Sequence, residues 1–288
     1  MLARFERPHR RNAQFLNERI EAIDLIGTVA SWLTARGHRL FVTADDAHAL
    51  SLDAFDVADD ALVPGLALSI GGDGTMLRAV RRVAQLGTPV LGVNVGALGY
   101  LTQVEPPALL SSLEKYFLGE STIEERMMIR VNRVGGKPGD GELALNEVVV
   151  EKSEAGHTVH LLVKIDGTDF TTYAADGLIV ATPTGSTAYS LSVRGPIVSP
   201  SHRALLLTPV SPHMLFDRSL LLSPHESIDI EVLGHRNAEL TIDGGRIAYL
   251  VPGDVIRCSA ANVSARFVRF GANPFHQILK AKFGLSDR

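Results

Sequence analysis

The five residues Gly71-Gly72-Asp73-Gly74-Thr75 have the clearest chemical potential in the sequence. They follow the apolar run Leu66–Ile70 and precede a helical pattern. Adjacent glycines let the backbone approach a ligand closely, and the first turn of a helix offers N–H groups and a positive dipole end to a phosphate. A carboxylate there faces a hydroxyl or a magnesium ion more readily than a phosphate. The motif suggests phosphoryl transfer, with an ionised Asp73 orienting or deprotonating an acceptor hydroxyl. The alternative is an ordinary glycine turn with an aspartate as helix cap.

Two later segments also carry polar residues beside apolar runs. Asn146-Glu147 interrupts the run Leu143–Val150, which the pattern predicts to be one strand. Buried polar side chains are costly unless each finds a partner, although an isolated pair also suits a strand edge. The run Asp176–Ser190 reads as an apolar strand, a loop of hydroxyls and glycine, and a short helix. Tyr189 there offers a ring face to a base. The alternative is a serine- and threonine-rich turn with a helix cap.

The pattern of elements changes near residue 104. Before it, helical periodicity at 16–33 and 76–84 alternates with strand-like runs at 40–42, 66–70 and 89–93, which predicts a parallel sheet with crossover helices. After it, strand follows strand, with turns such as GGKPGD. We therefore expect an α/β N-terminal domain over residues 1–104, joined by a helical segment within 274–288, and an all-β C-terminal domain over 105–273. The later strands are expected at 127–131, 143–150, 159–165, 170–173, 178–181, 205–208, 228–232, 238–242 and 265–270.

Composition narrows the class of protein. Of the 288 residues, 45% are hydrophobic and 21% charged, which suits a packed core. The formal net charge of -4 argues against a protein that coats nucleic acid. The single cysteine, Cys258, excludes an internal disulfide. Neither a secretory signal nor an apolar run approaching the ~20 residues of a membrane helix is visible. We expect a cytoplasmic protein with neither a nucleic-acid nor a membrane partner.

Taken together, the three motifs resemble the NAD kinase family, which phosphorylates the 2′-hydroxyl of the adenosine ribose of NAD to form NADP. GGDGT alone is also found in lipid kinases and is similar to a phosphofructokinase signature. GGDGT, then NE, then DGLIVATPTGSTAYS, in this order and at these distances, is far more specific. GALGYLT (96–102), LTPVSPHML (207–215) and LTIDGG (240–245) agree further.

The resemblance covers residue 40 to the C-terminus. It implies a NAD site between the two domains, a homodimer or homotetramer, and ATP or another phosphoryl donor with Mg²⁺ or another divalent cation. It places Asp73 against the 2′-hydroxyl, Gly74 against the substrate and Arg78 near the phosphates, and it assigns Asn146 and Glu147 to the adenine and ribose groups. The other positions to which it assigns substrate or cofactor contacts are Gly72, Thr75, Tyr100, His157, Ala174, Asp176, Ser186, Thr187, Ala188, Tyr189, Ser190, Ser192, His213 and Gly245.

Two of these assignments have plain alternatives, and the sequence departs from the family pattern in four places. Instead of binding a ligand, His157 could be an exposed loop histidine. In the same way, His213 could be an ordinary hydrogen-bonded histidine. Ala174 stands where bacterial members often carry arginine, Gly245 where glutamine is common, and Arg194 where a small residue or glycine is usual. The opening residues MLARFERPHRR lack the family's apolar first strand.

Two rival functions share part of this pattern. A lipid or sphingoid kinase would share GGDGT but would also need an apolar channel or a membrane-binding face, and no basic amphipathic helix is visible. A non-catalytic NAD-binding regulator would have no need of the carboxylate of Asp73.

Overall fold

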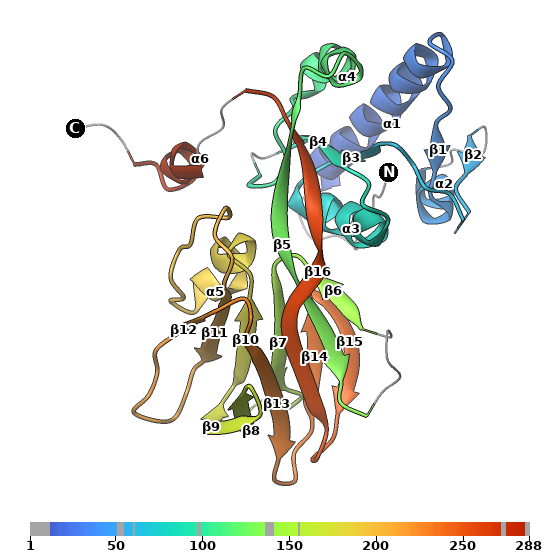
Figure 1. The fold of residues 1–288 in the computed structure, drawn as a ribbon. Coiled ribbons are helices and arrows are strands. Elements are labelled where there is room, and N and C mark those ends of the chain that lie inside the picture. Colours follow the sequence, from blue (N-terminus) through green and yellow to red (C-terminus); the bar gives the residue numbers. More distant parts are fainter. Residues whose placement is uncertain are drawn as a thin grey trace. The chain divides into compact units, whose positions relative to one another are not determined.

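The computed structural model describes residues 12–50, 55–59, 61–96, 99–135, 141–154, 156–271 and 275–285. The chain divides into two compact units (Figure 1). Unit 1 lies within residues 1–124 and 266–288, and unit 2 is residues 125–265. The sequence pattern changes near residue 104, but the division falls at residue 124. The reason is helix α4 (Leu109–Phe117), whose Leu109 and Leu113 are buried in the core of unit 1.

Unit 1 alternates helices and strands, as the sequence predicts. Strands β3 and β4 pair in parallel, with Leu68 opposite Leu91, and the end of β16 lies parallel beside β4 at Phe267. Strands β1 and β2 form a separate parallel pair. The elements of unit 1 are α1 (Asn12–Thr34), β1 (Phe41–Val42), α2 (Ala44–Leu50), β2 (Asp56–Val57), β3 (Ala67–Ile70), α3 (Asp73–Val83), η1 (Ala84–Leu86), β4 (Val90–Val93), η2 (Pro106–Ala108), α4 and α6 (Phe275–Lys282).

The core of unit 1 fixes the strand that leads into the glycine motif. Ile26, Val29 and Leu33 recur at three- and four-residue steps along α1 and are buried with Leu68 and Ile70 of β3. Burying each such side chain stabilises the fold by roughly 1.5–3 kcal/mol. Because α1 packs in one core with β3, the carboxyl end of β3, where the glycine motif begins, has a defined position.

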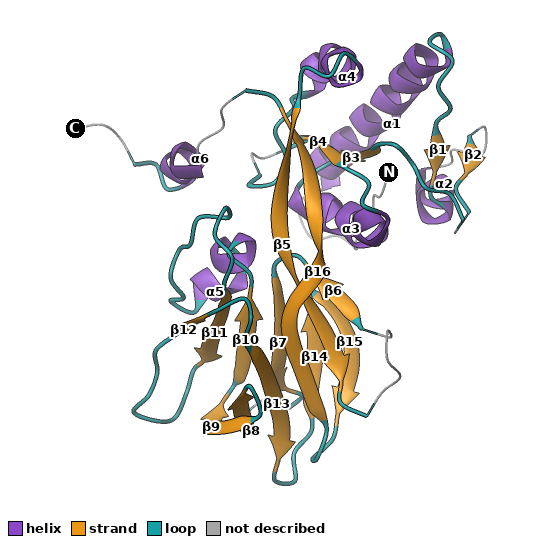
Figure 2. Cartoon of the chain, viewed as in Figure 1, coloured by secondary structure: helices purple, strands orange, loops and turns teal. Residues whose placement is uncertain are grey.

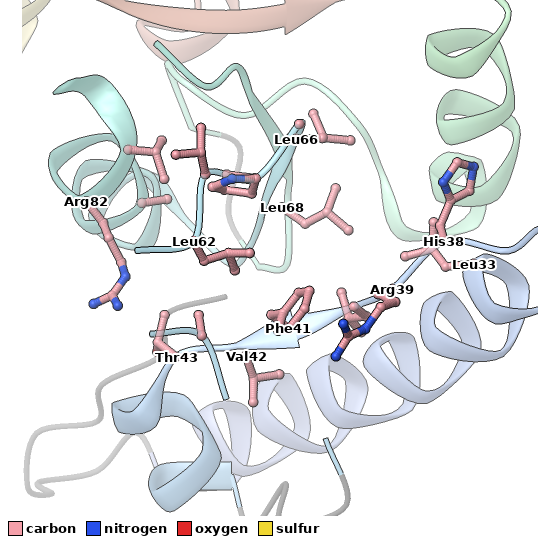
Figure 3. A pocket seen from close by; sticks show the side chains of 18 of the residues that line it. Leu33, His38, Arg39, Phe41, Val42, Thr43, Leu62, Leu66, Leu68 and Arg82 are labelled. Carbon is pink, nitrogen blue, oxygen red and sulfur yellow. The ribbon is translucent and has the colours of Figure 1, made fainter. Parts of the chain in front are cut away.

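A cavity of about 490 Å³ lies in unit 1 between β1 and β3 (Figure 3). Two runs, residues 38–43 and 62–68, supply most of its lining. Leu62, Leu66 and Phe41 make its wall largely apolar, and Arg82 lies at its edge (Figure 3). None of the site residues expected from the sequence lines this cavity, so it is separate from the predicted nucleotide site.

Unit 2 consists mainly of strands (Figure 2). One antiparallel sheet has the order β12-β11-β10-β7-β14-β15, and β16, β13, β8 and β9 form a second antiparallel series. The all-β prediction for the C-terminal domain is confirmed. The elements are β5 (Thr122–Arg133) and β16 (Val255–Arg269), which both cross the division between the units, with β6 (Glu142–Ala144), β7 (Glu147–Lys152), β8 (Val159–Ile165), β9 (Thr168–Ala175), β10 (Gly177–Ala181), η3 (Thr184–Thr187), α5 (Tyr189–Ser192), β11 (Leu205–Val210), β12 (Leu220–Leu222), β13 (Ser227–Leu233), β14 (Ala238–Ile242) and β15 (Gly245–Leu250).

The central strands of the six-stranded sheet are buried on both faces. Val148 and Val150 of β7 belong to the main core of unit 2, which also takes residues from β8 and β13. Val149 points to the opposite face and packs with Ile179 and Leu206. Burial on both sides explains why these strands read as continuous apolar runs rather than alternating ones.

The sequence predicts one strand over residues 143–150, and this prediction is wrong. The structure breaks the run into β6, which pairs with β5, and β7, which pairs with β10 and β14. The break lies at Leu145 and Asn146, between the two strands. The backbone N–H groups at this point donate to the side chain of Asp243, in the turn of another hairpin.

Arg194 occupies a backbone conformation that suits glycine. Its φ is +67°, in the left-handed region, where an L side chain meets steric strain. The neighbouring Gly195 has no room for a side chain, because a Cβ there would meet the Oγ of Ser190. This conformation explains why glycine is usual at the position of Arg194 in the family pattern, because glycine adopts a positive φ without steric strain.

Arg194→Gly should relieve this strain and raise the free energy of unfolding by about 0.5–1 kcal/mol. We expect a rise of about 1–4 °C in the thermal midpoint, measured by differential scanning calorimetry. Arg203→Gly is the matched control, because Arg203 is also exposed but has an ordinary negative φ. The control should be destabilised. A fall in the midpoint for Arg194→Gly would contradict the strain argument.

Candidate active site

Asp73 is the first residue of α3 and ties the start of this helix to a second loop. Its Oδ2 accepts the backbone N–H of Tyr100 at 2.8 Å, and its Oδ1 accepts the backbone N–H of Leu101 at 3.0 Å. Each oxygen keeps a further lone pair for another partner. The carboxylate is half-buried. Asp73 is thus held in one orientation while still able to accept another hydrogen bond.

Two glycines leave the space that Asp73 and its neighbours occupy. Gly71 has a φ of +146°, and a Cβ there would lie 2.6 Å from the Oγ1 of Thr75. A Cβ at Gly99 would meet the Oδ1 of Asp73 and would lie 2.9 Å from the Oγ1 of Thr102. Any side chain at these positions would push apart the contacts that orient the carboxylate.

The start of α3 is also open to an anion. Its N-cap, Gly72, is extended and has no side chain to cap the helix. The N–H groups of the first turn of a helix lack intrahelical partners, and this end carries the positive end of the dipole. Gly74 in that turn is exposed, and the half-buried Arg78 lies one turn further on, with an Nη2 atom 3.4 Å from the Oγ1 of Thr75. This combination suits a phosphate group.

Tyr100 lies beside Asp73, so the structure brings these two predicted residues together. Burial, and then the negative charge of Asp73, raise the pKa of the Tyr100 phenol above its usual value of 10.0. The Nζ of Lys282 lies 5.0 Å from the centre of the Tyr100 ring, which is cation–π distance. Tyr100 is therefore a neutral hydroxyl at physiological pH, next to the carboxylate.

In unit 2, the carboxylate of Asp243 holds the backbone at Asn146 and Glu147. It accepts three consecutive N–H groups, from Leu145 at 2.9 Å, Asn146 at 2.7 Å and Glu147 at 3.1 Å. The N–H of Asp243 donates in return to the carbonyl of Glu147 at 3.0 Å. The sequence pattern alone assigns no role to Asp243, which lies two residues before Gly245 in LTIDGG. An aspartate before glycines in a hairpin turn is a signal for side-chain-to-backbone bonding.

The same backbone is held from the other side by Thr182. Its N–H donates to the carbonyl of Asn146 at 2.8 Å, and its Oγ1 donates to the carbonyl of Leu145 at 2.6 Å. Gly185 packs directly on this point, since a Cβ there would lie 2.7 Å from the Cα of Asn146. The Asn146-Glu147 pair thus lies between the turn of Asp243 and the loop that follows β10.

Glu147 is an ionisable group in a site that disfavours its charge. It is 6% exposed, and its Oε2 has no hydrogen-bond partner among the described residues. Burial first, and then the charge of Asp243, raise the pKa of Glu147 to about 7, while the backbone N–H of Tyr189 acts to lower it. Near neutral pH this carboxyl can therefore donate or accept a hydrogen bond.

Tyr189 shares a patch with Glu147 and Asp176. Burial, followed by the charges of Glu151, Asp176 and Glu147, raises the pKa of Tyr189 above 10.0. The Tyr189 residue is 37% exposed, which leaves part of the ring open to a ligand. Asp176 forms an ion pair with the Nζ of Lys152 at 2.6 Å. The structure therefore brings together, within unit 2, three residues that the sequence analysis assigned to the nucleotide.

Other predicted residues of the same loop bond inside the protein. The Oγ of Ser186 donates to the carbonyl of Pro183 at 2.7 Å, and the Oγ of Ser190 lies 3.2 Å from the Oγ1 of Thr208. Both serines are fully buried, so their hydroxyls shape the loop. Thr187 bonds to the carbonyl of Thr184, also within the loop, at 3.3 Å. Ala188 is half-buried and Ser192 is exposed.

The remaining predicted residues lie on separate parts of unit 2. His157 is exposed and lines a polar cavity of about 340 Å³ together with Lys152, His235 and Arg236. His213 is exposed, and its backbone N–H donates to the carbonyl of Ala174 at 2.7 Å. Gly245 begins β15, opposite Ile242. Their ligand contacts stay predictions.

Among the residues that the structure describes, no group of three or more His, Cys, Asp or Glu side chains is placed to hold a metal ion. In the same part of the chain, no helix combines the length and apolar character needed to cross a bilayer.

The chain thus combines an α/β unit, whose glycine-rich helix start suits a phosphate group, with a β-rich unit, as a phosphate-binding two-domain protein would. The sequence model of the ATP-NAD kinase N-terminal domain matches residues 15–121, and that of the ATP-NAD kinase C-terminal domain matches residues 145–270. The chain belongs to the NAD kinase family.

Curated relatives and solved structures agree with this assignment. The NAD kinase of Moorella thermoacetica is 40% identical over 98% of this chain and 88% of its own length. That of Heliobacterium modesticaldum is 39% identical over 92% and 95%. The crystal structure of yeast NADH kinase complexed with NADH has a TM-score of 0.81 at 26% identity, covering 94% of this chain and 85% of that one. An Archaeoglobus fulgidus NAD kinase in complex with ATP, 24% identical, shares the fold with a TM-score of 0.67 and covers 85% of this chain and 98% of its own.

Glu147 should make the stability of the protein fall as the pH rises from about 4.5 to about 7. Its pKa is raised in the folded state, so the unfolded state loses this proton first and is stabilised relative to the folded state across that range. A rise from 4.5 to about 7 corresponds to about 3 kcal/mol, at 1.36 kcal/mol per pH unit. Glu147→Gln should therefore unfold at a higher denaturant concentration than wild type at pH 8, and at a similar one at pH 4.5.

Glu120→Gln is the control, because Glu120 is an exposed carboxyl. Its urea midpoint should follow that of wild type at both pH values. If Glu147→Gln also follows wild type at pH 8, the carboxyl of Glu147 is not penalised in the folded state.

Proposed function

We propose that this chain is an NAD kinase that transfers the γ-phosphoryl group of ATP to the 2′-hydroxyl of the adenosine ribose of NAD, forming NADP. The observation that carries the proposal is Asp73, a carboxylate held by two backbone N–H bonds at the open N-terminus of α3. The family membership supports the reaction, because the curated relatives are named NAD kinase.

In this mechanism Asp73 acts on the acceptor hydroxyl. The carboxylate accepts a hydrogen bond from the 2′-hydroxyl and takes its proton as the oxygen attacks the γ-phosphorus. The bond between that phosphorus and the β,γ-bridging oxygen of ATP breaks, and ADP leaves with the bridging oxygen. Phosphoryl transfer needs little covalent help, so most of the rate enhancement comes from positioning and from stabilising charge. The N–H groups at the start of α3, with Arg78 one turn along, supply positive charge toward a phosphate.

The residues of unit 2 hold the dinucleotide. Asn146 and Glu147 bond to the adenine and ribose groups, and the exposed part of the Tyr189 ring stacks on a base. Glu147 suits a ligand with mixed donors and acceptors, because its buried Oε2 has no partner among the described residues. Asp176, beside Lys152, adds an acceptor for sugar hydroxyls.

A divalent cation such as Mg²⁺ belongs to the proposal. Carboxylate oxygen is the ligand type that Mg²⁺ prefers, and in nucleotide enzymes this cation takes few protein ligands besides phosphate and water oxygens. Asp73 fits that requirement, since each of its oxygens has one N–H partner and a lone pair to spare. When bound, the cation would neutralise charge on the triphosphate. The residues of the chain would still orient the acceptor and accept its proton.

We also propose that the protein is a cytoplasmic homodimer or homotetramer. Support comes from β15, which lies at the edge of the six-stranded sheet and exposes apolar side chains. Ile247 is 37% and Tyr249 58% exposed, and Val251 beyond the strand is 50% exposed. An exposed apolar edge strand is a liability that oligomers commonly cover. Light scattering on the purified chain measures the assembly directly.

Asp73→Asn should lower kcat by about 10²–10⁴-fold, the usual contribution of a positioned general base. The asparagine keeps a carbonyl oxygen for one of the two loop N–H groups, and a thermal scan checks that the variant stays folded. The chain is incubated with NAD, ATP and Mg²⁺, and NADP is detected with an NADP-specific dehydrogenase. Near-normal turnover by the variant would end the assignment of Asp73 as base.

Asp45→Asn provides the matched control, because Asp45 is an exposed aspartate in the first turn of another helix of unit 1. It should turn over like wild type. The same assay separates the rival functions. A lipid kinase forms no NADP, and a regulator binds NAD without converting it.

A further inference from the structure

Asp243 lies where it can control the nucleotide-binding pair of unit 2. It is the turn residue between β14 and β15, with a φ of +48°, and the carboxylate is half-buried rather than free in solvent. Its oxygens take up three consecutive N–H groups, of Leu145, Asn146 and Glu147, at the point where β6 ends and β7 begins. These N–H groups donate to the Asp243 side chain at the point where the chain stops pairing with β5 and begins to pair with β10 and β14.

The break in the strand has a consequence for the side chains. Successive residues of a regular strand point to opposite faces of the sheet. A continuous strand over residues 143–150 would thus send Asn146 and Glu147 to opposite faces. At the break, Thr182 donates its Oγ1 hydrogen to the carbonyl of Leu145 and its backbone N–H to the carbonyl of Asn146. The Oγ1 of Thr182 also accepts the backbone N–H of Gly185, so the other side of the backbone is fixed as well.

From these contacts we infer that Asp243 is a positioning residue, whose carboxylate sets the orientation of Asn146 and Glu147 toward the dinucleotide. The inference rests on the proposed function for the identity of the ligand. Asp243 itself bonds to the backbone and acts through its two neighbours. Hydrogen bonds from N–H groups to a charged acceptor are among the stronger ones in proteins, and three on one carboxylate form a rigid anchor.

The test substitutes the carboxylate and measures NAD binding directly. Asp243→Asn replaces one acceptor oxygen by an NH₂ group that faces N–H donors. Isothermal titration calorimetry with NAD should show affinity weakened by at least about tenfold, on the scale of one lost charged hydrogen bond. In turnover assays, the KM for NAD should rise by a similar factor while the KM for ATP changes less than about twofold.

Asp166→Asn is the matched control. Asp166 is also an aspartate in a left-handed hairpin turn, with φ +49°, and its Oδ1 accepts the N–H of Ser227 at 2.8 Å. A general loss of turn stability would affect both variants alike. The control should keep the NAD affinity of wild type. If Asp243→Asn also keeps it, or if the two KM values rise together, the positioning role is overturned.

A second variant covers the case in which Asp243→Asn does not fold. Asp243→Gly suits the positive φ and removes the carboxylate entirely, and it should show the same loss of NAD affinity. A double variant with Glu147→Gln should lose less than the sum of the two single effects, because Asp243 acts through Glu147. Additive losses would contradict this.

The outcomes also separate this inference from the proposed reaction. If wild type forms NADP and Asp243→Asn binds NAD normally, the reaction stands and the positioning role fails. If wild type binds NAD without forming NADP, and Asp243→Asn weakens that binding, the positioning role stands and the reaction fails.

Discussion

Two carboxylates, one in each unit, make the same kind of interaction: each accepts consecutive backbone N–H groups from another segment of its own unit. In unit 1, Asp73 binds the N–H groups of Tyr100 and Leu101 and so joins the start of α3 to a distant loop. In unit 2, Asp243 joins a hairpin turn to the break between β6 and β7. Such bonds connect segments far apart in sequence. Gly99 leaves space for the Asp73 carboxylate, and Gly185 leaves space for the Asn146 backbone on the side away from Asp243.

The two carboxylates differ in what they can do besides holding the backbone. Asp73 stands at a helix start with an exposed glycine beside it, so its remaining lone pairs can meet a ligand. The oxygens of Asp243 accept three N–H groups, so this carboxylate holds the backbone of Leu145, Asn146 and Glu147 instead. Its charge also helps to raise the pKa of Glu147. Asp73 therefore has the geometry to meet a ligand, while Asp243 orders the backbone of its neighbours.

Much of the fold could be predicted from the sequence because local patterns determine it. Helical periodicity over residues 16–33 predicts the helix, although the structure buries Ile26 and Val29 with Leu33 rather than the face through Ile23 and Ala30. The change from alternating elements to successive strands marks two kinds of unit. Hydrogen bonds between residues far apart in the sequence cannot be predicted from such local patterns. The break near Asn146 and the role of Asp243 arise from contacts between residues about a hundred positions apart, whose local sequence reads as an ordinary strand and turn. Likewise Ser186 and Ser190, which look ligand-facing by type, are buried and bond within the protein.

The role proposed for Asp73 is to activate one particular hydroxyl of NAD. Phosphorus NMR of the product formed from NAD and ATP with Mg²⁺ tests it most directly, because it reports which oxygen carries the new phosphate. We expect a 2′-phosphomonoester on the adenosine ribose for wild type, and only traces of it for Asp73→Asn at equal enzyme concentration. A phosphate on another hydroxyl, or equal product from both proteins, would contradict it.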